Sequence, residues 1–235
     1  AGTAGAANND GSINVTNQWA NTAAGFSITK YEGTGANATV GHGLNTKPEF
    51  VMIKPLELAE DWIVGHASRS FEKYLHLNLD NAEADHDSLF NDTDPTNTVV
   101  SLGTADSTNA SSKDHIMYCW APIKSYSAIG SYTGNGADNG PFIYTGMKPA
   151  WLMIKRTDAV KGWFLIDAVR NPTNVIQGSL FPHDTTAEHT GTGHEIDFLS
   201  NGFKIRKNND RHNASSGTYI YVCFAEHPFK LSRAR

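Results

Sequence analysis

The chain has 235 residues, of which 18 % are charged, and its formal net charge is −5. This length suits one large domain or two small ones, and the acidic balance argues against nucleic acid or an anionic membrane as a partner. No apolar run approaches the roughly 18 residues of a membrane span, and the start lacks the basic and apolar regions of a secretory signal. We therefore expect neither nucleic-acid binding nor membrane insertion.

The first 24 residues are small, polar and rich in turn formers. This composition predicts a linker or an extended N-terminal arm over residues 1–24. Trp19 stands out, because a single large aromatic in such an arm typically docks into a groove of a neighbouring unit or subunit. We expect Trp19 to serve assembly packing. The chain does not begin with Met, so we also expect that it was cut from a longer protein.

The following hundred residues contain short segments rich in β-branched and aromatic residues and bounded by Gly, Asn, Asp or Pro. In one of them, leucines alternate with His76 and Asn78, which predicts one buried and one solvated face. We interpret His76 as a solvated strand residue rather than a ligand. The predicted strands cover residues 49–55, 61–68, 74–80, 97–103 and 115–122.

The second half of the chain has the same character. A turn is predicted at residues 157–162, and Asn201–Gly202 predicts a tight hairpin with a type I′ turn, in which both residues have positive φ. No segment of ten residues shows a helical period, so the chain is predicted to be all-β. The predicted strands cover residues 142–147, 150–156, 162–170, 196–207 and 218–226.

The two halves repeat one another. YEGTGA at 31–36 and KPEFVMIK at 47–54 recur 101 positions later as YTGNGA and KPAWLMIK, and NASS at 109–112 and Cys119 recur 104 positions later. This pattern predicts an internal duplication, with two tandem antiparallel β-sandwich-like units at 25–125 and 126–235. Residues that occur in both copies are then expected to serve the fold rather than binding or catalysis. The two cysteines are paired in this way, and we favour two separate core thiols over a bond between units.

Two loops in corresponding regions do not repeat, and we favour the interpretation that both are ordinary solvated loops. The alternative is a binding function, because variable loops on a repeated scaffold are where binding usually resides. Neither matches a calcium loop or a zinc pattern, although three histidines of the second loop are our choice if a metal binds. The metal ligands stay undetermined, and we expect no cofactor beyond a structural divalent metal. The candidate binding residues are Asp85, His86, Asp87, Asp92 and Asp94 in the first loop and His183, Asp184, His189 and His194 in the second.

Four segments together resemble a known protein family. They are GFSITKYEGTGANATVGHGLNTKP from Gly25, WLMIKRTD from Trp151, DFLSNGFKIR from Asp197 and GTYIYVCFAEHPFK from Gly217. In combination they resemble the C-terminal repeat domains of tail-fibre and related virion appendage proteins of bacteriophages, notably phages of aquatic and marine bacteria. The resemblance covers essentially the whole chain, and the head resembles the segment that joins one such repeat to the next, which implies further repeats upstream.

The resemblance implies a place on the extracellular phage particle, with other virion proteins and the chain itself, as a homotrimer, for partners. It brings no catalytic residues. Three functions compete: a non-enzymatic module that binds host surface polysaccharide, a structural virion component such as a fibre shaft, decoration or connector, and a glycan depolymerase that uses two loop carboxylates. Short polar side chains and a 10 % aromatic content suit sugar binding. We therefore favour the non-enzymatic receptor-binding module.

Overall fold

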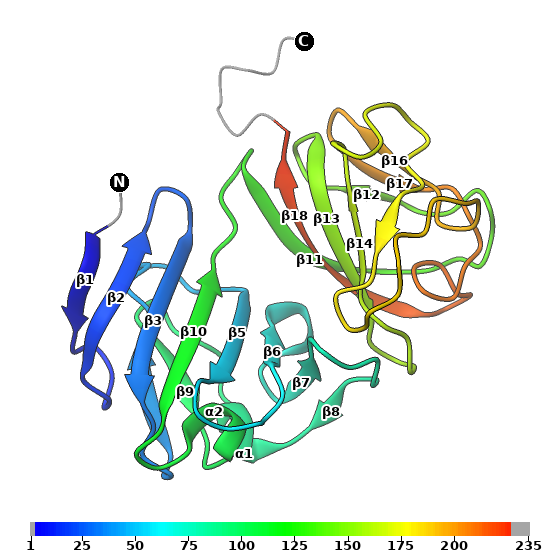
Figure 1. The fold of residues 1–235 in the computed structure, drawn as a ribbon. Helices are drawn as coiled ribbons and strands as arrows, with labels where there is room; N and C mark the ends of the chain where they lie inside the picture. The colour runs from blue at the N-terminus through cyan, green and yellow to red at the C-terminus, as the bar shows by residue number, and fades with distance from the viewer. Residues whose placement is uncertain (1–2, 227–235) are drawn as a thin grey trace. The chain divides into compact units, whose positions relative to one another are not determined.

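The computed structural model describes residues 3–226, which form two compact units (Figure 1). The first unit holds the described residues up to Leu77 together with Glu83–Pro122, and the second holds Asn78–Ala82 and the described residues from Ile123 onward. The division after Pro122 lies close to the predicted boundary after residue 125. Antiparallel strands dominate both units, which confirms the all-β class.

The first unit contains one large and one small sheet. The large sheet has the strand order β1-β2-β3-β10-β5-β6-β7-β8, and β4 pairs with β9 in the small sheet. Three single-turn helices lie in the connections: η1 (Ala67–Arg69), α1 (Asp87–Phe90) and α2 (Asp106–Asn109). The strands are β1 (Thr3–Asn8), β2 (Val15–Asn21), β3 (Phe26–Glu32), β4 (Ala38–Gly41), β5 (Phe50–Pro55), β6 (Ile63–His66), β7 (Lys73–His76), β8 (Ala84–Asp85), β9 (Val99–Leu102) and β10 (Asp114–Trp120).

The segment predicted as a linker or arm forms the hairpin β1–β2, and β2 extends the large sheet by pairing with β3. The side chain of Gln18 is buried there, and its Nε2 donates to Thr29 Oγ1 at 2.9 Å and to the Gly41 carbonyl at 2.8 Å. A buried amide needs such partners. The hairpin is therefore held by polar contacts, which its composition did not reveal. Trp19 packs on Phe26 at 5.8 Å, and its role in assembly stays a prediction.

The second unit has the same two-sheet organisation. One sheet has the order β11-β18-β13-β14-β15 and the other β12-β17-β16. Turn residues 157–162 lie between β13 and β14, as predicted. The strands are β11 (Ser127–Thr133), β12 (Phe142–Tyr144), β13 (Pro149–Arg156), β14 (Phe164–Asp167), β15 (Ser179–Leu180), β16 (Ile196–Leu199), β17 (Gly202–Ile205) and β18 (Thr218–Ala225).

Each unit has its own hydrophobic core, to which both of its sheets contribute. Val100 of the small sheet and Met117 of the large sheet belong to the first core, and Phe203 and Leu152 have the same relation in the second. The two cysteines are buried free thiols, as predicted. Burial in these apolar surroundings raises the pKa of the Cys223 thiol to about 12, so the thiol stays protonated and acts as a small apolar side chain.

The repeated asparagines make the same contacts in both units. The side-chain oxygen of Asn109 accepts from the Thr34 N–H at 2.8 Å, and that of Asn213 accepts from the Asn135 N–H at 2.9 Å. Each amide nitrogen also donates, at 2.7 Å, to the carbonyl two residues after its N–H partner. Both side chains are fully buried. These bonds explain why the YxGxGA and NASS segments recur together, and they assign NASS to the scaffold.

The hairpin β16–β17 is present, but its turn differs from the predicted one. Leu199 pairs with Gly202, so the turn residues are Ser200 and Asn201, and neither has a positive φ. The type I′ prediction is therefore wrong. Gly202 is required for another reason: a Cβ at this position would lie 2.1 Å from the Ile143 carbonyl oxygen of the neighbouring strand.

Candidate functional site

A shallow, open depression of about 350 Å³ lies on the first unit. Its lining residues are Asp85, His86, Asp87 and Asp92. All four belong to the first predicted loop, so the structure brings together four of that loop's five candidate residues.

The single-turn helix α1 shapes this depression. His86 caps the start of the helix, where its Nδ1 accepts from the Ser88 N–H at 3.3 Å and lies 2.7 Å from Ser88 Oγ. Leu89 and Phe90 are buried and anchor the turn in the first core. Asn91 ends the helix in the left-handed conformation, with φ of 54°. The loop thus buries its apolar residues and leaves its acidic residues in solvent.

The depression is rich in hydrogen-bond acceptors. Asp85 pairs with Lys73 at 2.6 Å, and this hydrogen bond raises the pKa of the Lys73 ammonium group. Within residues 3–226, neither Asp87 nor Asp92 forms an ion pair with a lysine or arginine. The lining therefore favours hydroxyl or ammonium donors over anions.

Asp94, the fifth candidate of this loop, does not line the depression. Its carboxylate lies 2.7 Å from Lys47 Nζ and accepts from the Phe71 N–H at 3.0 Å. Burial raises the pKa of this carboxyl, but the bonds from Lys47 and Phe71 outweigh that effect and hold the pKa below its usual range. Asp94 thus ties the end of the loop to the scaffold.

The histidines of the second loop are packed against aromatic side chains. His194 is 6 % exposed, its Nδ1 lies 2.8 Å from Ser179 Oγ, and its ring stands edge-on to Phe164 at 5.2 Å. The His189 ring is 4.2 Å from the His194 ring, and its backbone pairs with Ser179. Burial, the largest cause, lowers the pKa of His194 to about 4, so its imidazole is neutral near pH 7.

His183 is also packed inward. Its ring lies edge-on to Phe181 at 6.3 Å and occupies the space left by Gly162, where a Cβ would come within 1.8 Å of the ring. Burial lowers the pKa of His183. Asp184 is exposed, lies 3.1 Å from His183 Nε2 and accepts from the Thr186 N–H at 2.6 Å. Of the four candidates in this loop, Asp184 is exposed, His183 and His189 are half-buried, and His194 is buried.

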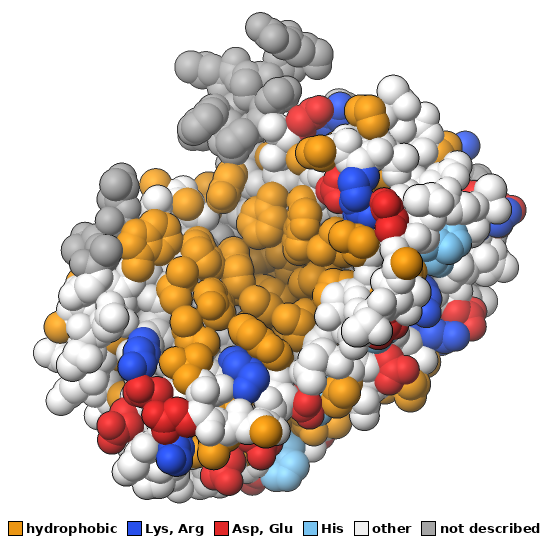
Figure 2. All heavy atoms as spheres, viewed as in Figure 1, with side chains coloured by type: hydrophobic (Ala, Val, Ile, Leu, Met, Phe, Trp, Pro, Cys, Tyr) orange, Lys and Arg blue, Asp and Glu red, His pale blue; other side chains and the backbone are white. Residues whose placement is uncertain are grey.

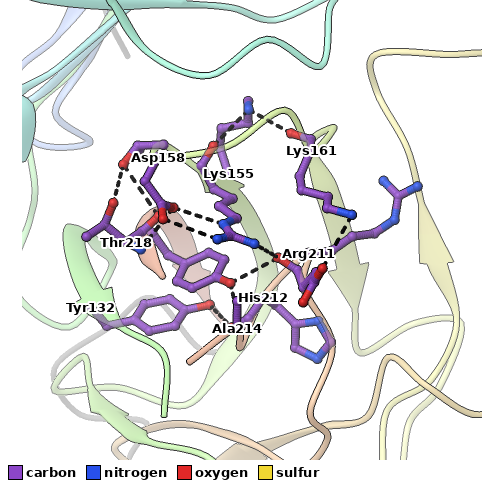
Figure 3. A network of polar contacts seen from close by, with 12 residues as sticks. Tyr132, Lys155, Asp158, Lys161, Arg211, His212, Ala214 and Thr218 are labelled. Carbon is purple, nitrogen blue, oxygen red and sulfur yellow. Dashed lines mark hydrogen bonds and ion pairs between the residues drawn. The ribbon is translucent and has the colours of Figure 1, made fainter. Parts of the chain in front are cut away.

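A fourth histidine, His212, joins this cluster and was not singled out from the sequence. It stacks on Phe164 at 5.2 Å with an angle of 6° between the rings, and burial lowers its pKa to about 3. Figure 3 shows the polar network around it, in which Tyr132 Oη donates to the His212 carbonyl at 2.8 Å. In the same network, Tyr219 Oη accepts from the Ala214 N–H at 2.7 Å. The second loop contacts this scaffold through His194, whose ring lies 6.0 Å from the His212 ring.

The repeated lysine of KPxxxMIK is part of this scaffold. Lys155 is fully buried, and its Nζ donates to the carbonyls of Arg156 at 2.8 Å and Lys161 at 2.7 Å (Figure 3). In the first unit, Lys54 Nζ donates in the same way to the carbonyls of Pro55 and Leu58. Each lysine closes the turn that follows its own strand, so we assign it a structural role.

No group of three or more histidine, cysteine, aspartate or glutamate side chains in residues 3–226 is placed to hold a metal ion. Both candidate loops lie within this part of the chain. A structural divalent metal at His183, His189 and His194 therefore has no assembled ligand set here.

A second surface feature is the outer face of the large sheet of the first unit. Figure 2 shows hydrophobic side chains gathered over β3, β10 and β5. Phe26 lies 4.8 Å from Trp120 and 6.5 Å from Tyr118, and Trp62 lies 6.2 Å from Tyr118. These side chains are half-buried. Trp163, the repeat partner of Trp62, is 1 % exposed and belongs to the scaffold.

These features define an all-β protein of paired antiparallel sheets with an open acidic depression on one unit. By sequence, the chain belongs to the family described as domain of unknown function DUF7483, whose profile matches residues 1–228. Neither the curated proteins nor the solved structures contain a significant match to the chain. Among the described residues, no helix is long and apolar enough to cross a membrane.

Proposed function

We propose that this chain is a non-enzymatic receptor-binding module of a phage tail fibre, which recognises a glycan on the host cell surface. One observation carries the proposal: the loop that does not repeat places Asp85, His86, Asp87 and Asp92 around one open depression. The YxGxGA, KPxxxMIK and NASS segments repeat between the units, whereas this loop differs from its counterpart, so specificity is expected here. The sequence resemblance to phage appendage repeats supports the same assignment.

The chemistry of the lining fits sugars with free hydroxyl groups. Carboxylate oxygens accept hydrogen bonds from neighbouring hydroxyls, and the imidazole of His86 offers a further polar partner. Because the lining contains three carboxylates and neither lysine nor arginine, it disfavours uronic acids and sulfated sugars. We therefore propose neutral or amino sugars as the ligand class.

Assembly would make a weak site effective. The proposed homotrimer presents three copies of the depression, and simultaneous binding of several copies raises the overall affinity by a factor of roughly 10² or more. The proposed partners are thus the chain itself, other virion proteins and host polysaccharide. The proposed location is the extracellular phage particle.

The test compares the wild type with the double variant Asp87→Asn/Asp92→Asn. Binding is measured by calorimetry with soluble mannan, galactan, laminarin and dextran, and by competition with phage adsorption. We expect the wild type to bind at least one of these neutral glycans and to block adsorption. The variant should bind at least about tenfold more weakly, because charge-assisted hydrogen bonds contribute roughly 1.5–3 kcal/mol each.

The matched control is Glu60→Gln, which removes one exposed carboxylate outside the depression and should leave binding unchanged. If the wild type binds none of the glycans and does not block adsorption, the proposal is wrong. A structural role in the virion would then be the better explanation.

A further inference from the structure

The outer face of the small sheet of the second unit carries an ordered set of side chains. Phe142 pairs with Lys204 across β12 and β17, and Lys204 pairs with Asp197 across β17 and β16. In the next row that faces outward, Tyr144 pairs with Gly202, which pairs with Leu199. Directly paired residues share a face of the sheet, while the intervening Ile143, Phe198 and Phe203 point into the core.

Two aromatic rings on this face are open to solvent. Tyr144 is 68 % exposed and Phe142 is 44 % exposed, and they are the only exposed Phe, Tyr or Trp side chains within residues 3–226. They lie two residues apart on one strand, about 7 Å along its direction. This spacing is comparable to the length of one sugar residue. Large aromatic side chains are mostly buried in soluble proteins, so two exposed ones on one face indicate an interaction surface.

Gly202 lies between Tyr144 and Leu199, has no side chain of its own and is buried. A Cβ at Gly202 would come within 2.9 Å of Phe142 Cζ, so the Phe142 ring reaches over this backbone. The Phe142 ring therefore covers the Gly202 backbone, and aromatic carbon forms the centre of this face. A flat ligand with an apolar face fits such a floor better than a bulky side chain does.

The charges on this face balance. Lys204 Nζ donates to the Gly140 carbonyl at 2.5 Å, and Arg206 lies 3.5 Å from the carboxylate of Asp197. Glu195, opposite Arg206, accepts from the Gly193 N–H at 2.7 Å. Lys204 and Asp197 lie on this face, and Arg206 and Glu195 lie just beyond the ends of β17 and β16, so two cations are matched by two carboxylates. Charge complementarity favours a neutral partner, with polar groups at the rim to meet hydroxyls.

We propose that this face is a second glycan subsite, on which a neutral glycan chain stacks its sugar rings against Tyr144 and Phe142; the inference rests on the proposed function. The exposed aromatic surface, on the order of 200 Å², is small beside the roughly 800 Å² that each partner buries in a stable protein interface. A membrane surface would call for an excess of lysine and arginine, which this face lacks.

The test uses Tyr144→Ala and Phe142→Ala/Tyr144→Ala in the full chain, with cellohexaose, maltohexaose and mannohexaose as probes and dextran sulfate as the acidic comparison. For the probe that the wild type binds, Tyr144→Ala should weaken binding about threefold to tenfold, as expected for one lost aromatic contact. The double variant should weaken it further. Tyr144→Phe keeps the ring and should bind as the wild type does.

Val169→Ala is the matched control, since Val169 is 88 % exposed and lies outside this sheet. Binding by the wild type that is unchanged in the double variant overturns the subsite and leaves the proposed function standing. No binding by the wild type overturns both. A shift of the double variant to a smaller oligomer by light scattering, or wild-type binding to phosphatidylcholine vesicles that the double variant loses, assigns the face to another partner and overturns the subsite.

Discussion

The loops at 85–97 and 183–195 occupy corresponding regions of the two units, yet they use their polar residues in opposite ways. In the first loop, a helical turn buries Leu89 and Phe90 and leaves carboxylates around an open depression. In the second loop, the His194 imidazole contacts Ser179 Oγ and the Phe164 ring and lies in the interior of the unit. A neutral imidazole tolerates burial with one hydrogen-bond partner, whereas an ionised carboxylate does not. Side-chain chemistry thus decides which loop stays open.

The largest expected change in stability is at Phe164, the buried ring on which the histidines of the second unit pack. Phe164 is fully buried and contacts His194 and His212. Phe164→Ala should lower the free energy of unfolding of the second unit by about 4 kcal/mol, because it removes a buried ring and leaves a cavity. Urea denaturation measures the loss. Tyr144→Ala, at an exposed ring, should change stability by less than about 0.5 kcal/mol. Equal effects of the two changes would contradict the packed interior of this loop.

The next effect is acid sensitivity of the second unit. Burial holds the pKa of His194 at about 4 and that of His212 at about 3, against an ordinary value of 6.5. The unfolded chain therefore takes up these protons before the folded chain does. The stabilisation is complete above pH 6.5 and is lost as the pH falls toward 4, by on the order of 3 kcal/mol for His194, since one pKa unit is about 1.4 kcal/mol.

Hydrogen exchange followed by mass spectrometry at pH 7 and pH 4.5, corrected for intrinsic rates, tests this effect segment by segment. The groups that act on His194 are His189 and Arg211, which lower its pKa, and Glu195, which raises it. Protection should fall most over residues 179–212. In the first unit, burial also lowers the pKa of His42, so a smaller loss is expected there. An equal loss of protection in both units would contradict the conclusion that buried histidines make the second unit more sensitive to acid.

If the two units differ in their loops and not in their scaffolds, equivalent scaffold residues should contribute equally to stability. Asn109→Ala and Asn213→Ala each remove a fully buried amide that bonds a glycine-rich turn, the one after β3 and the one after β11 respectively. Each change should cost roughly 2 kcal/mol, because it leaves buried backbone groups without partners. Urea unfolding of the two variants should give similar losses. A difference larger than about 1 kcal/mol would show that the two scaffolds are not energetically equivalent.

The smallest effect is expected in the open loop. Asp92 is exposed and lines the depression. Asp92→Asn should leave the unfolding free energy within about 0.5 kcal/mol of the wild type, as surface substitutions usually do. Thermal unfolding monitored by circular dichroism measures the change. A clear loss of stability would mean that this carboxylate serves the fold rather than a ligand.

Most strands could be predicted because their burial alternates. In β10, for example, His115, Met117 and Cys119 are buried and their neighbours are half-buried. The hairpin β1–β2 could not, because a buried glutamine holds it and few apolar residues mark it. The register of the β16–β17 turn also differed, since close approach of another strand, not turn geometry, requires Gly202.

The candidate site was predictable in part. Asp85 to Asp92 lie within eight residues, so a single helical turn suffices to gather them. The burial of His194 depends on Ser179 and Phe164, which lie far away in the sequence, and no local pattern reveals it. The sequence does indicate that Phe142 and Tyr144 share one face of a strand, because they flank Ile143. The sequence alone does not tell which of the two faces is buried.

The buried asparagine amides also indicate which parts of a unit can change in sequence without loss of the fold. Asn109 and Asn213 each fasten a glycine-rich turn to the segment before the last strand of their unit through backbone groups, and none of their bonds involves the loops at 85–97 or 183–195. Changes at the exposed positions of these loops should therefore leave the bonds of the two asparagines intact. If the proposed glycan binding holds, ligand preference can change through exposed loop residues such as Asp87 and Asp92, while buried Leu89 and Phe90 and the asparagine bonds keep the frame.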